Sequence, residues 1–578
     1  MNKKIIPVLA VIVCLLGAYA VHLFLSDKPT SVDDASLRIT GNDKAEIPTA
    51  EIPAPADEIV PQKVKVEEEK FTGVLDMKKW RYNSKDEVLY QTGIYYAQSS
   101  LKSEYQKMAL FVPEKYLRCQ KSNDGFYACD PNMASLIDGY TVRTAPIVTQ
   151  ISSSQFAAEP ALNEYRSFKE YTDAGLIYAH IGFRGAEHGA PATVADIKAA
   201  IRFIKSNSER IPGNTESVFI LAANHGGLLA SIVGASGNDR SYTPYLQEIG
   251  AINNVEDNIK GVMVINPKGA LDTANEALEW ILNRNRQDLS EEQKKISDKM
   301  AKEYANYVNR AGFIGPRGEG LTLQYSQKGV YQDGTYYDYI KSIMENSLAD
   351  LMLHNKFPYA VPKSWEISED RAEAEKNIKL AGTYQSREKL VDDLNAKKVW
   401  VELNTSYGLK IKMASIRDFN NIFVRKHLPL ASYDGFNKNN KENILFGLGD
   451  KKGLHFDAYT AKVFKGVPQG KEYAADLYKQ DKFGYITLKR VNIFNPLYYL
   501  LSSYEGYKTS NVAPYWNIRT GVFQNNEPLT SSVNLFLAVN NHPDVKKVVF
   551  NPLWGMGDIS EIGKKDRMDF ISWINSNR

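Results

Sequence analysis

A buried-type strand that passes through a small-residue turn into a helix limits the fold of this chain more than any other feature. The strand-like run Ser217–Ala222 is followed by the turn Ala223–Gly227 (ANHGG) and the apolar helical run Leu228–Gly234. A sharp strand-to-helix crossing needs small residues where the two backbones meet, and Gly226 and Gly227 supply them. This segment therefore predicts a sheet covered by helices.

The same pattern of apolar strands and amphipathic helices recurs along the chain. The helical spacing of Thr193–Asn207 separates two such strands, and the alternation is typical of βαβ units with a mostly parallel sheet. The pattern stops after about residue 283, where a long charged helix is predicted at Leu289–Ala311. It resumes near residue 510, and a last helix is predicted at Lys564–Asn577. The further predicted strands are Lys107–Val112, Ala145–Gln150, Gly175–Ile181, Ile259–Ile265, Tyr515–Thr520 and Val545–Asn551. A sheet that is interrupted and then completed predicts an α/β-hydrolase fold with a large lid insertion.

This pattern divides the chain into five segments. We expect a membrane anchor or signal segment at 1–25, a disordered stalk rich in proline and acidic residues at 26–70, and the first part of the hydrolase core at 71–285. The lid occupies 286–509, and the last part of the core occupies 510–578.

The amino-terminal segment predicts the compartment. Lys3 and Lys4 precede the apolar run Ile5–Leu25, which as a helix spans about 31 Å, the thickness of a bilayer core. The lysines place the rest of the chain outside the cytoplasm, so we expect a protein anchored in the inner membrane of a bacterial envelope with its body in the periplasm. The sequence Ala18-Tyr19-Ala20 leaves open a cleaved signal peptide and an exported protein.

Two cysteines agree with an exported body. Cys119 and Cys129 flank the turn signal Asn123–Gly125, so two short strands are expected to bring the thiols together. In an oxidising compartment such a pair forms a disulfide, and the alternative is two thiols that pack as small apolar groups.

Composition excludes several classes of function. With 71 Lys+Arg against 68 Asp+Glu the formal net charge is +3, so there is no electrostatic case for a nucleic-acid partner. No dinucleotide fingerprint and no metal-ligand spacing occur, and the pair His455 and Asp457 is of a kind that is usually structural. We expect neither a cofactor nor a metal.

The five residues Ala222–Gly226 stand where a hydrolase of this fold carries its nucleophile turn, and the nucleophile position is here Asn224. A carboxamide has no hydroxyl or thiol that can form an acyl-enzyme. The general base of the fold follows the last core strand, yet the final histidine of the chain, His542, precedes that strand.

Several motifs resemble the bacterial tannase and feruloyl-esterase-like α/β-hydrolases, the subtype B tannases. The similarity is densest between residues 175 and 285 and extends weakly over roughly 88–578. It rests on Gly182–Gly185 (GFRG), Gly189–Ala192 (GAPA), Asp196–Arg202 (DIKAAIR), Ile211–Thr215 (IPGNT), Gly234–Gly237 (GASG), Tyr242–Leu246 (YTPYL) and Leu271–Trp280 (LDTANEALEW). The family hydrolyses galloyl and feruloyl esters.

The resemblance implies that all three triad positions are replaced. The family's serine corresponds to Asn224, its acid falls at Gln524 or Asn526, and its histidine falls in the region of Gly555 and Met556. We therefore expect no serine-hydrolase reaction.

Two residues that lie near the family's catalytic positions are candidates for catalysis from displaced positions. His225 follows the nucleophile position, and Glu527 is one residue out of register with the acid. The other candidates for lining a ligand cleft are Ser152, Ser153, Ser154, Arg184 and Gly226, with His225 among them. Each has an ordinary alternative role in holding a loop or a helix end.

Three functions compete. The first is an envelope-anchored, tannase-like protein that has lost catalysis and binds an aromatic or glycan ligand or an envelope protein partner. The second is an active carboxylic-ester hydrolase that uses displaced residues. The third is a structural component of the envelope.

Overall fold

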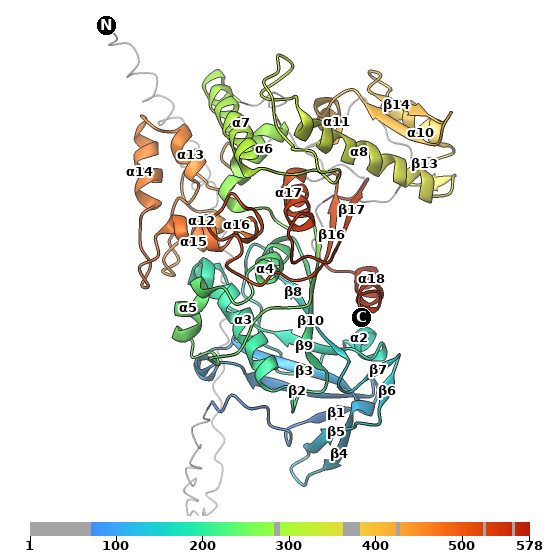
Figure 1. Cartoon of the computed structure of the whole chain (residues 1–578), viewed down its shortest axis with the longest axis vertical. Coiled ribbons are helices and arrows are strands. Elements are labelled where there is room, and N and C mark those ends of the chain that lie inside the picture. Colours follow the sequence, from blue (N-terminus) through green and yellow to red (C-terminus); the bar gives the residue numbers. More distant parts are fainter. Residues whose placement is uncertain (1–70, 283–288, 362–381, 424–427, 524–526, 558–560) are drawn as a thin grey trace, which may run out of the picture. The chain divides into compact units, whose positions relative to one another are not determined.

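A nine-stranded sheet forms the centre of the molecule. The computed structural model describes residues 71–282, 289–361, 382–423, 428–523, 527–557 and 561–578. The strands are arranged in the order β1-β2-β3-β9-β8-β10-β11-β16-β17 (Figure 1). Their bounds are β1 Arg81–Asn83, β2 Val88–Tyr95, β3 Lys107–Pro113, β8 Pro146–Ser152, β9 Ile177–Ile181, β10 Asn214–Ala223, β11 Gly261–Ile265, β16 Tyr515–Gly521 and β17 Lys547–Leu553.

The sheet is parallel from β9 onward. The pairs β9–β8, β8–β10, β10–β11, β11–β16 and β16–β17 are parallel, whereas β1, β2 and β3 pair antiparallel with one another and β3 pairs antiparallel with β9. The strand order after β1 is that of an α/β-hydrolase, with β10 as the strand that leads into the nucleophile turn. The predicted fold class is confirmed for the hydrolase core.

Helices cover both faces of the sheet. Phe219 of β10 packs edge-to-face on Trp573 of α18, with ring centroids 5.7 Å apart. Gly234 of α4 lies so close to Val262 of β11 that an added Cβ would come within 2.5 Å of its methyl group. Phe219 pairs with Gly261, the neighbour of Val262, and successive strand residues point to opposite faces, so α4 and α18 lie on opposite faces.

A small set of helices covers each face of the sheet (Figure 1). On the first face, α3 and α5 accompany α4, and on the second, α2 accompanies α18. The bounds are α2 Lys169–Asp173, α3 Ala190–Ser206, α4 Asn224–Ala235, α5 Thr243–Glu248, α17 Leu529–Asn540 and α18 Lys564–Asn575. The hydrophobic core lies between the sheet and these layers.

The described part of the chain between β11 and β16 carries further helices and two small hairpins. The helix α7 begins with a Ser290 cap and ends at Gly312, close to the predicted Leu289–Ala311. The helices of this interval are α6 Ala274–Leu282, α7 Glu291–Ala311, α8 Thr335–His354, α10 Arg387–Leu394, α11 Ile416–Phe423, α12 Lys441–Leu445, α13 Ala458–Val463, α14 Pro468–Asp476, α15 Thr487–Ile493 and α16 Pro496–Leu500. The hairpins are β12 Tyr359–Ala360 with β13 Thr383–Tyr384 and β14 Val401–Asn404 with β15 Lys410–Met413.

The predicted disulfide is present. Cys119 in β4 (Leu117–Lys121) and Cys129 in β5 (Tyr127–Pro131) face each other across a hairpin and are bonded. A second small hairpin, β6 Leu136–Ile137 with β7 Tyr140–Thr141, comes after it in the chain.

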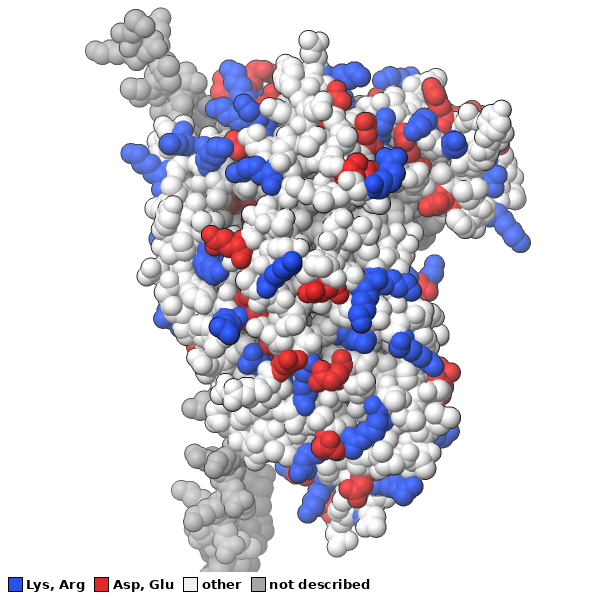
Figure 2. All heavy atoms as spheres, viewed as in Figure 1, with Lys and Arg blue, Asp and Glu red and all other residues white. Residues whose placement is uncertain are grey.

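The predicted anchor 1–25 and stalk 26–70 lie outside the described residues. Within the described ranges, no helix has both the length and the apolar character needed to span a bilayer. On the face that Figure 2 shows, acidic and basic side chains are intermingled, which agrees with the small net charge.

Candidate functional site

The turn between β10 and α4 has the backbone geometry of a nucleophile elbow. Ala223 is extended, and Asn224 adopts a positive φ of 49°, a region in which asparagine is favoured over most other side chains. The carbonyl oxygen of Asn224 accepts a hydrogen bond from the backbone N–H of Lys268, at 3.0 Å. The sharp turn of the fold is therefore retained, with a carboxamide at its apex.

Two glycines make this turn sterically possible. A Cβ on Gly226 would lie 2.3 Å from the carbonyl oxygen of Ile151, and a Cβ on Gly227 would lie 2.9 Å from the Cα of Pro267. These backbones approach too closely for any larger residue. Gly226, predicted as a cleft candidate, is thus a packing residue of the elbow.

His225 lies beside the apex but is held by neighbours. Its ring packs edge-to-face on Phe156 with centroids 4.7 Å apart, and its Nε2 lies 3.9 Å from Oε1 of Glu442 in α12. The side chain is 13% exposed. The structure therefore places His225 and the carboxylate of Glu442 near Asn224, and the imidazole packs against the ring of Phe156.

The three serines after β8 have different surroundings. Ser152 ends the strand and lines a cavity, whereas Ser153 is buried and its hydroxyl donates to the carbonyl of Ala157 at 2.9 Å. Ser154 is exposed, and its carbonyl accepts the Ala157 N–H. Of the three, Ser152 is the one that faces a space large enough for a ligand.

Arg184 is paired inside the protein. Its guanidinium donates twice to the carboxylate of Asp196 in α3, at 2.9 and 2.8 Å, and its backbone N–H donates to the same group. Asp196 is fully buried and also accepts a hydrogen bond from Gln106. This bidentate pair with a buried carboxylate fixes the loop before α3, while 15% of the Arg184 side chain remains exposed.

The acid region is represented by Glu527, since Gln524 and Asn526 lie outside the described residues. Oε1 of Glu527 accepts from the N–H of Gly269 and from the hydroxyl of Ser531, and Oε2 accepts from the hydroxyl of Tyr433 at 2.9 Å. The ammonium of Lys268 lies 3.2 Å from the same carboxylate. Both oxygens are therefore engaged in joining three segments of the chain.

The loop after β17, where the fold carries its general base, holds backbone contacts instead. The carbonyl of Met556 accepts the N–H of Phe523, and the carbonyl of Gly557 accepts the amide of Asn266. Gly555 has a positive φ of 76°. The sequence has no histidine after His542, so this loop offers no imidazole in its described part or elsewhere.

His542 cannot take that role from a distance. It is buried at the end of α17, and α17 runs from the carboxyl end of β16 back to the amino end of β17. The adjoining Lys546 N–H donates to the carbonyl of Pro514, just before β16 begins. His542 therefore lies at the end of the sheet opposite to Asn224.

The pair predicted to be structural, His455 and Asp457, is organised by a residue that the sequence analysis missed. The buried carboxylate of Asp434 contacts Nδ1 of His455 at 2.8 Å and accepts the backbone N–H groups of Phe456 and Asp457. No local pattern marks Asp434, because its partners are about twenty residues away.

One group of side chains in the described ranges has the spacing of cation ligands: His455, Glu472 and Asp476. Lys438 contacts both Glu472 and Asp476, and Lys479 lies 2.8 Å from Asp476. These carboxylates are thus already compensated by lysines.

Comparisons with known protein families and solved structures agree with the α/β-hydrolase fold described above. Residues 141–313 match the BD-FAE family model. No curated protein matches the chain. Tannin acyl hydrolase from Lactobacillus plantarum superposes with a TM-score of 0.61 at 20% identity, over 85% of this chain and 94% of that one.

Two further solved structures give the same result. Tannase from Lactobacillus plantarum in an orthorhombic crystal has a TM-score of 0.63 at 19% identity and covers 87% of this chain and 99% of that chain. Fusobacterium nucleatum tannase has a TM-score of 0.62 at 21% identity, with 85% and 94% covered. The resemblance predicted from the motifs is confirmed as a likeness: part of the chain matches the BD-FAE family model, and the chain has the α/β-hydrolase fold that these tannase structures share.

Proposed function

We propose that this chain is a tannase-like protein that no longer performs the serine-hydrolase reaction and instead binds a ligand or partner. The observation that carries the proposal is the elbow itself. Its backbone keeps the positive φ at Asn224 and the close glycine contacts, while its apex has no nucleophilic atom. Retention of the turn without its nucleophile supports a role other than catalysis.

The remaining triad positions support the same conclusion. The chain has no histidine after β17, so no imidazole follows the last strand to take a proton. A catalytic triad acts as a unit, and the loss of a single member removes several orders of magnitude of rate. Without the serine nucleophile and the histidine base, an acid alone cannot support the reaction.

We propose an aromatic or glycan ligand, or a protein partner in the envelope, as the molecule bound. The proposed localisation is the bacterial envelope, with residues 1–25 as an inner-membrane anchor, 26–70 as a stalk and the body in the periplasm. The disulfide between Cys119 and Cys129 supports an oxidising compartment. Removal of the first segment by cleavage gives the alternative of an exported protein.

The second candidate is an esterase that uses displaced residues. The position of His225 next to Asn224 and 3.9 Å from Glu442 favours it. Glu527 argues against it, because its carboxylate is engaged by Gly269, Ser531, Tyr433 and Lys268. A purely structural role in the envelope is the third candidate and predicts that no small ligand binds.

Reaction of the full-length protein with a fluorophosphonate probe tests the loss of catalysis. We expect no labelled serine and no turnover of a galloyl or p-nitrophenyl ester. The variant Asn224→Ser is expected to remain inactive as well, because the acid and the histidine are still absent. Labelling at any serine, or turnover that disappears in His225→Ala, establishes the esterase instead.

A calorimetric titration addresses binding. Methyl gallate and xylo-oligosaccharides serve as probes of the aromatic and glycan classes, with the wild-type chain in the cell. Saturable heat with either probe supports the proposal. If neither probe gives saturable heat and crosslinking recovers one envelope protein, the protein partner is favoured over the small ligand.

A further inference from the structure

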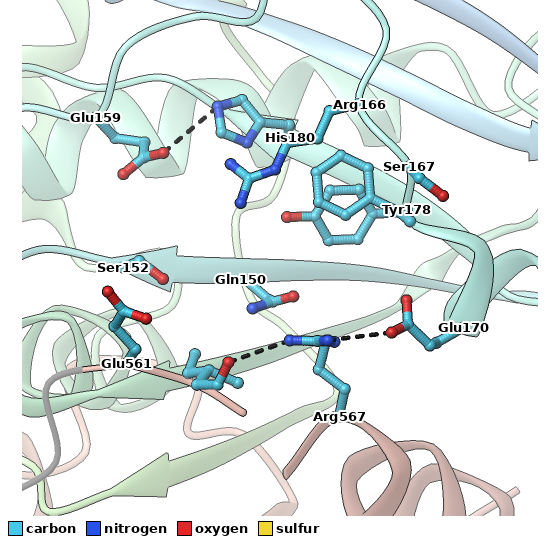
Figure 3. Close-up of a pocket in the computed structure, with 12 residues that line it drawn as sticks. Gln150, Ser152, Glu159, Arg166, Ser167, Glu170, Tyr178, His180, Glu561 and Arg567 are labelled. Carbon is cyan, nitrogen blue, oxygen red and sulfur yellow. Dashed lines mark hydrogen bonds and ion pairs between the residues drawn. The ribbon is translucent and has the colours of Figure 1, made fainter. Parts of the chain in front are cut away.

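A polar cavity of about 500 Å³ lies at the carboxyl ends of β8 and β9, on the face of the sheet covered by α2 and α18 (Figure 3). This is the face opposite to α4, and Asn224 is not among the lining residues. Volumes of this size are typical of small-molecule sites. The cavity is therefore separate from the elbow, and binding in it does not depend on whether the elbow has lost catalysis.

The floor of the cavity departs from the usual composition of a covered parallel sheet. Gln150 and Ser152 of β8 and Tyr178 and His180 of β9 point to the same face, since Val148 pairs with Tyr178 and side chains alternate along each strand. Strands that are buried on both faces normally carry apolar residues at such positions. Here Ser152 is exposed, and Gln150 is partly buried with its Oε1 accepting a hydrogen bond from the Tyr171 hydroxyl at 3.0 Å, so this polar row opens onto the cavity.

One of the two guanidinium groups at the cavity is already engaged. Arg567 of α18 lies 3.0 Å from the carboxylate of Glu170 in α2 and donates to the carbonyl of Ile562 at 3.1 Å (Figure 3). These bonds join the two helices that cover this face. Arg567 therefore lines the cavity with a guanidinium that is already paired, and an anion would need a cation from another residue.

Arg166 is that other residue. Its guanidinium lies 5.6 Å from the ring centroid of Phe168, and in the described part of the chain it makes no ion pair and no hydrogen bond. Figure 3 shows it among Glu159, His180 and Tyr178. A cation that faces a polar cavity without a carboxylate in contact is a receptor for an anionic group, and the planar fork of arginine suits a carboxylate.

The opposite wall offers a group that both donates and accepts. Burial raises the pKa of Glu159 to about 7 against the opposing charge of Arg166, so near neutral pH this carboxyl is present in both forms. Nε2 of His180 lies 3.7 Å from this carboxyl group (Figure 3), but burial lowers the pKa of His180 and the same Nε2 contacts the carbonyl of Pro160 at 2.9 Å, so the imidazole beside Glu159 is neutral. Hydroxyl groups, which donate and accept, match such a carboxyl better than an ammonium group does.

We propose that this cavity binds a small hydroxylated carboxylic acid of the sugar-acid class. Its carboxylate contacts Arg166, and its hydroxyl groups contact Glu159, Gln150 and Ser152.

Calorimetric titration of the full-length protein tests this assignment, with D-glucuronate as the probe. D-glucose keeps the hydroxyl groups without the carboxylate, and acetate keeps the carboxylate without the hydroxyl groups. We expect saturable binding of glucuronate and at least tenfold weaker binding of the other two. Arg166→Gln is expected to weaken glucuronate binding at least tenfold, and Arg166→Lys, which keeps the charge without the fork, is expected to lie between the two.

The matched control is Arg317→Gln, because the Arg317 side chain is 90% exposed and lies outside the cavity lining. It is expected to bind as the wild type does. Thermal unfolding followed by circular dichroism verifies that every variant is folded. The proposal is overturned if glucuronate does not bind saturably, if glucose binds as well as glucuronate, or if Arg166→Gln binds as tightly as the wild type.

Discussion

The carboxyl groups of Glu276 and Asp457 both lie 2.9 Å from the hydroxyl oxygen of Thr460. That hydroxyl has a single hydrogen and can donate to one carboxylate only, so the other contact requires a proton on the second carboxyl group. Asp457 accepts two backbone N–H bonds and is therefore the more acidic of the two, although burial and the charge of Asp434 raise its pKa to about 7. Burial and the charge of Asp457 raise the pKa of Glu276 well above its usual value.

A first prediction concerns the pH dependence of stability. Because folded Glu276 keeps its proton above pH 4.5, unfolding releases that proton, and the free energy of unfolding falls as pH rises from 4.5 through the raised pKa. Glu276→Gln is expected to reduce this slope by up to about 1.4 kcal/mol per pH unit, and the raised pKa values of Asp272, Glu159 and Asp457 leave the remainder. Urea unfolding between pH 5 and 8 measures the slope. The exposed Glu505→Gln serves as control, and an unchanged slope in Glu276→Gln contradicts the proton assignment.

The elbow gives a second prediction. In Gly226→Ala the new methyl group meets the carbonyl oxygen of Ile151, so the backbone must move at the most constrained turn of the core. We expect the free energy of unfolding to fall by about 1–3 kcal/mol. Gly320→Ala, where no atom lies within 4 Å of the added carbon, is expected to change it by less than about 0.5 kcal/mol. Equal stabilities of the two variants, measured by urea unfolding, would falsify the close approach.

A third prediction separates a structural role of Arg184 from ligand binding. Arg184→Met leaves the fully buried carboxylate of Asp196 without its cation, which costs about 3–5 kcal/mol of unfolding free energy. Arg317→Met removes an exposed partner of Glu319 and is expected to cost less than about 1 kcal/mol. If Arg184→Met unfolds like the wild type but loses binding of a ligand, Arg184 belongs to a binding site.

The disulfide supports a fourth prediction. The bond between Cys119 and Cys129 closes a short loop with a sequence separation of 10, and its loss is expected to lower the free energy of unfolding by about 2–3 kcal/mol. The double variant Cys119→Ser/Cys129→Ser reports this loss in urea unfolding. Dithiothreitol should destabilise the wild type by the same amount and leave the double variant unaffected. A wild type that is insensitive to the reductant goes against a stabilising role for this bond.

The parts of the fold that were predictable from sequence are those set by local pattern. Apolar runs such as Ser217–Ala222 and Ile259–Ile265 became β10 and β11, because a strand buried on both faces needs apolar residues at successive positions. The elbow was predictable for a similar reason, since its small residues are adjacent in the chain. The antiparallel β1 and β2 carry polar and glycine residues and gave no comparable signal.

The contacts that decide the roles of the candidate residues were not predictable in this way. Glu527 engages Gly269 and Tyr433, and Arg567 engages Glu170, across separations of 94 to 397 residues. Hydrophobic periodicity reports which face of an element is buried and carries no information on such partners. The polar alternation of Gln150 and Ser152 was visible in the sequence, yet only the neighbouring β9 turned it into the floor of a cavity.

The engagement of Glu527 by four partners bears on how this protein can change in evolution. On the proposed function, ester hydrolysis needs a serine at the elbow, a histidine after β17 and an acid released from its present bonds, and none of these changes alone is expected to raise the rate. Freeing the acid also loosens the loops after β11 and β16 that it now joins. On the proposed function, selection for turnover therefore has no single substitution on which to act.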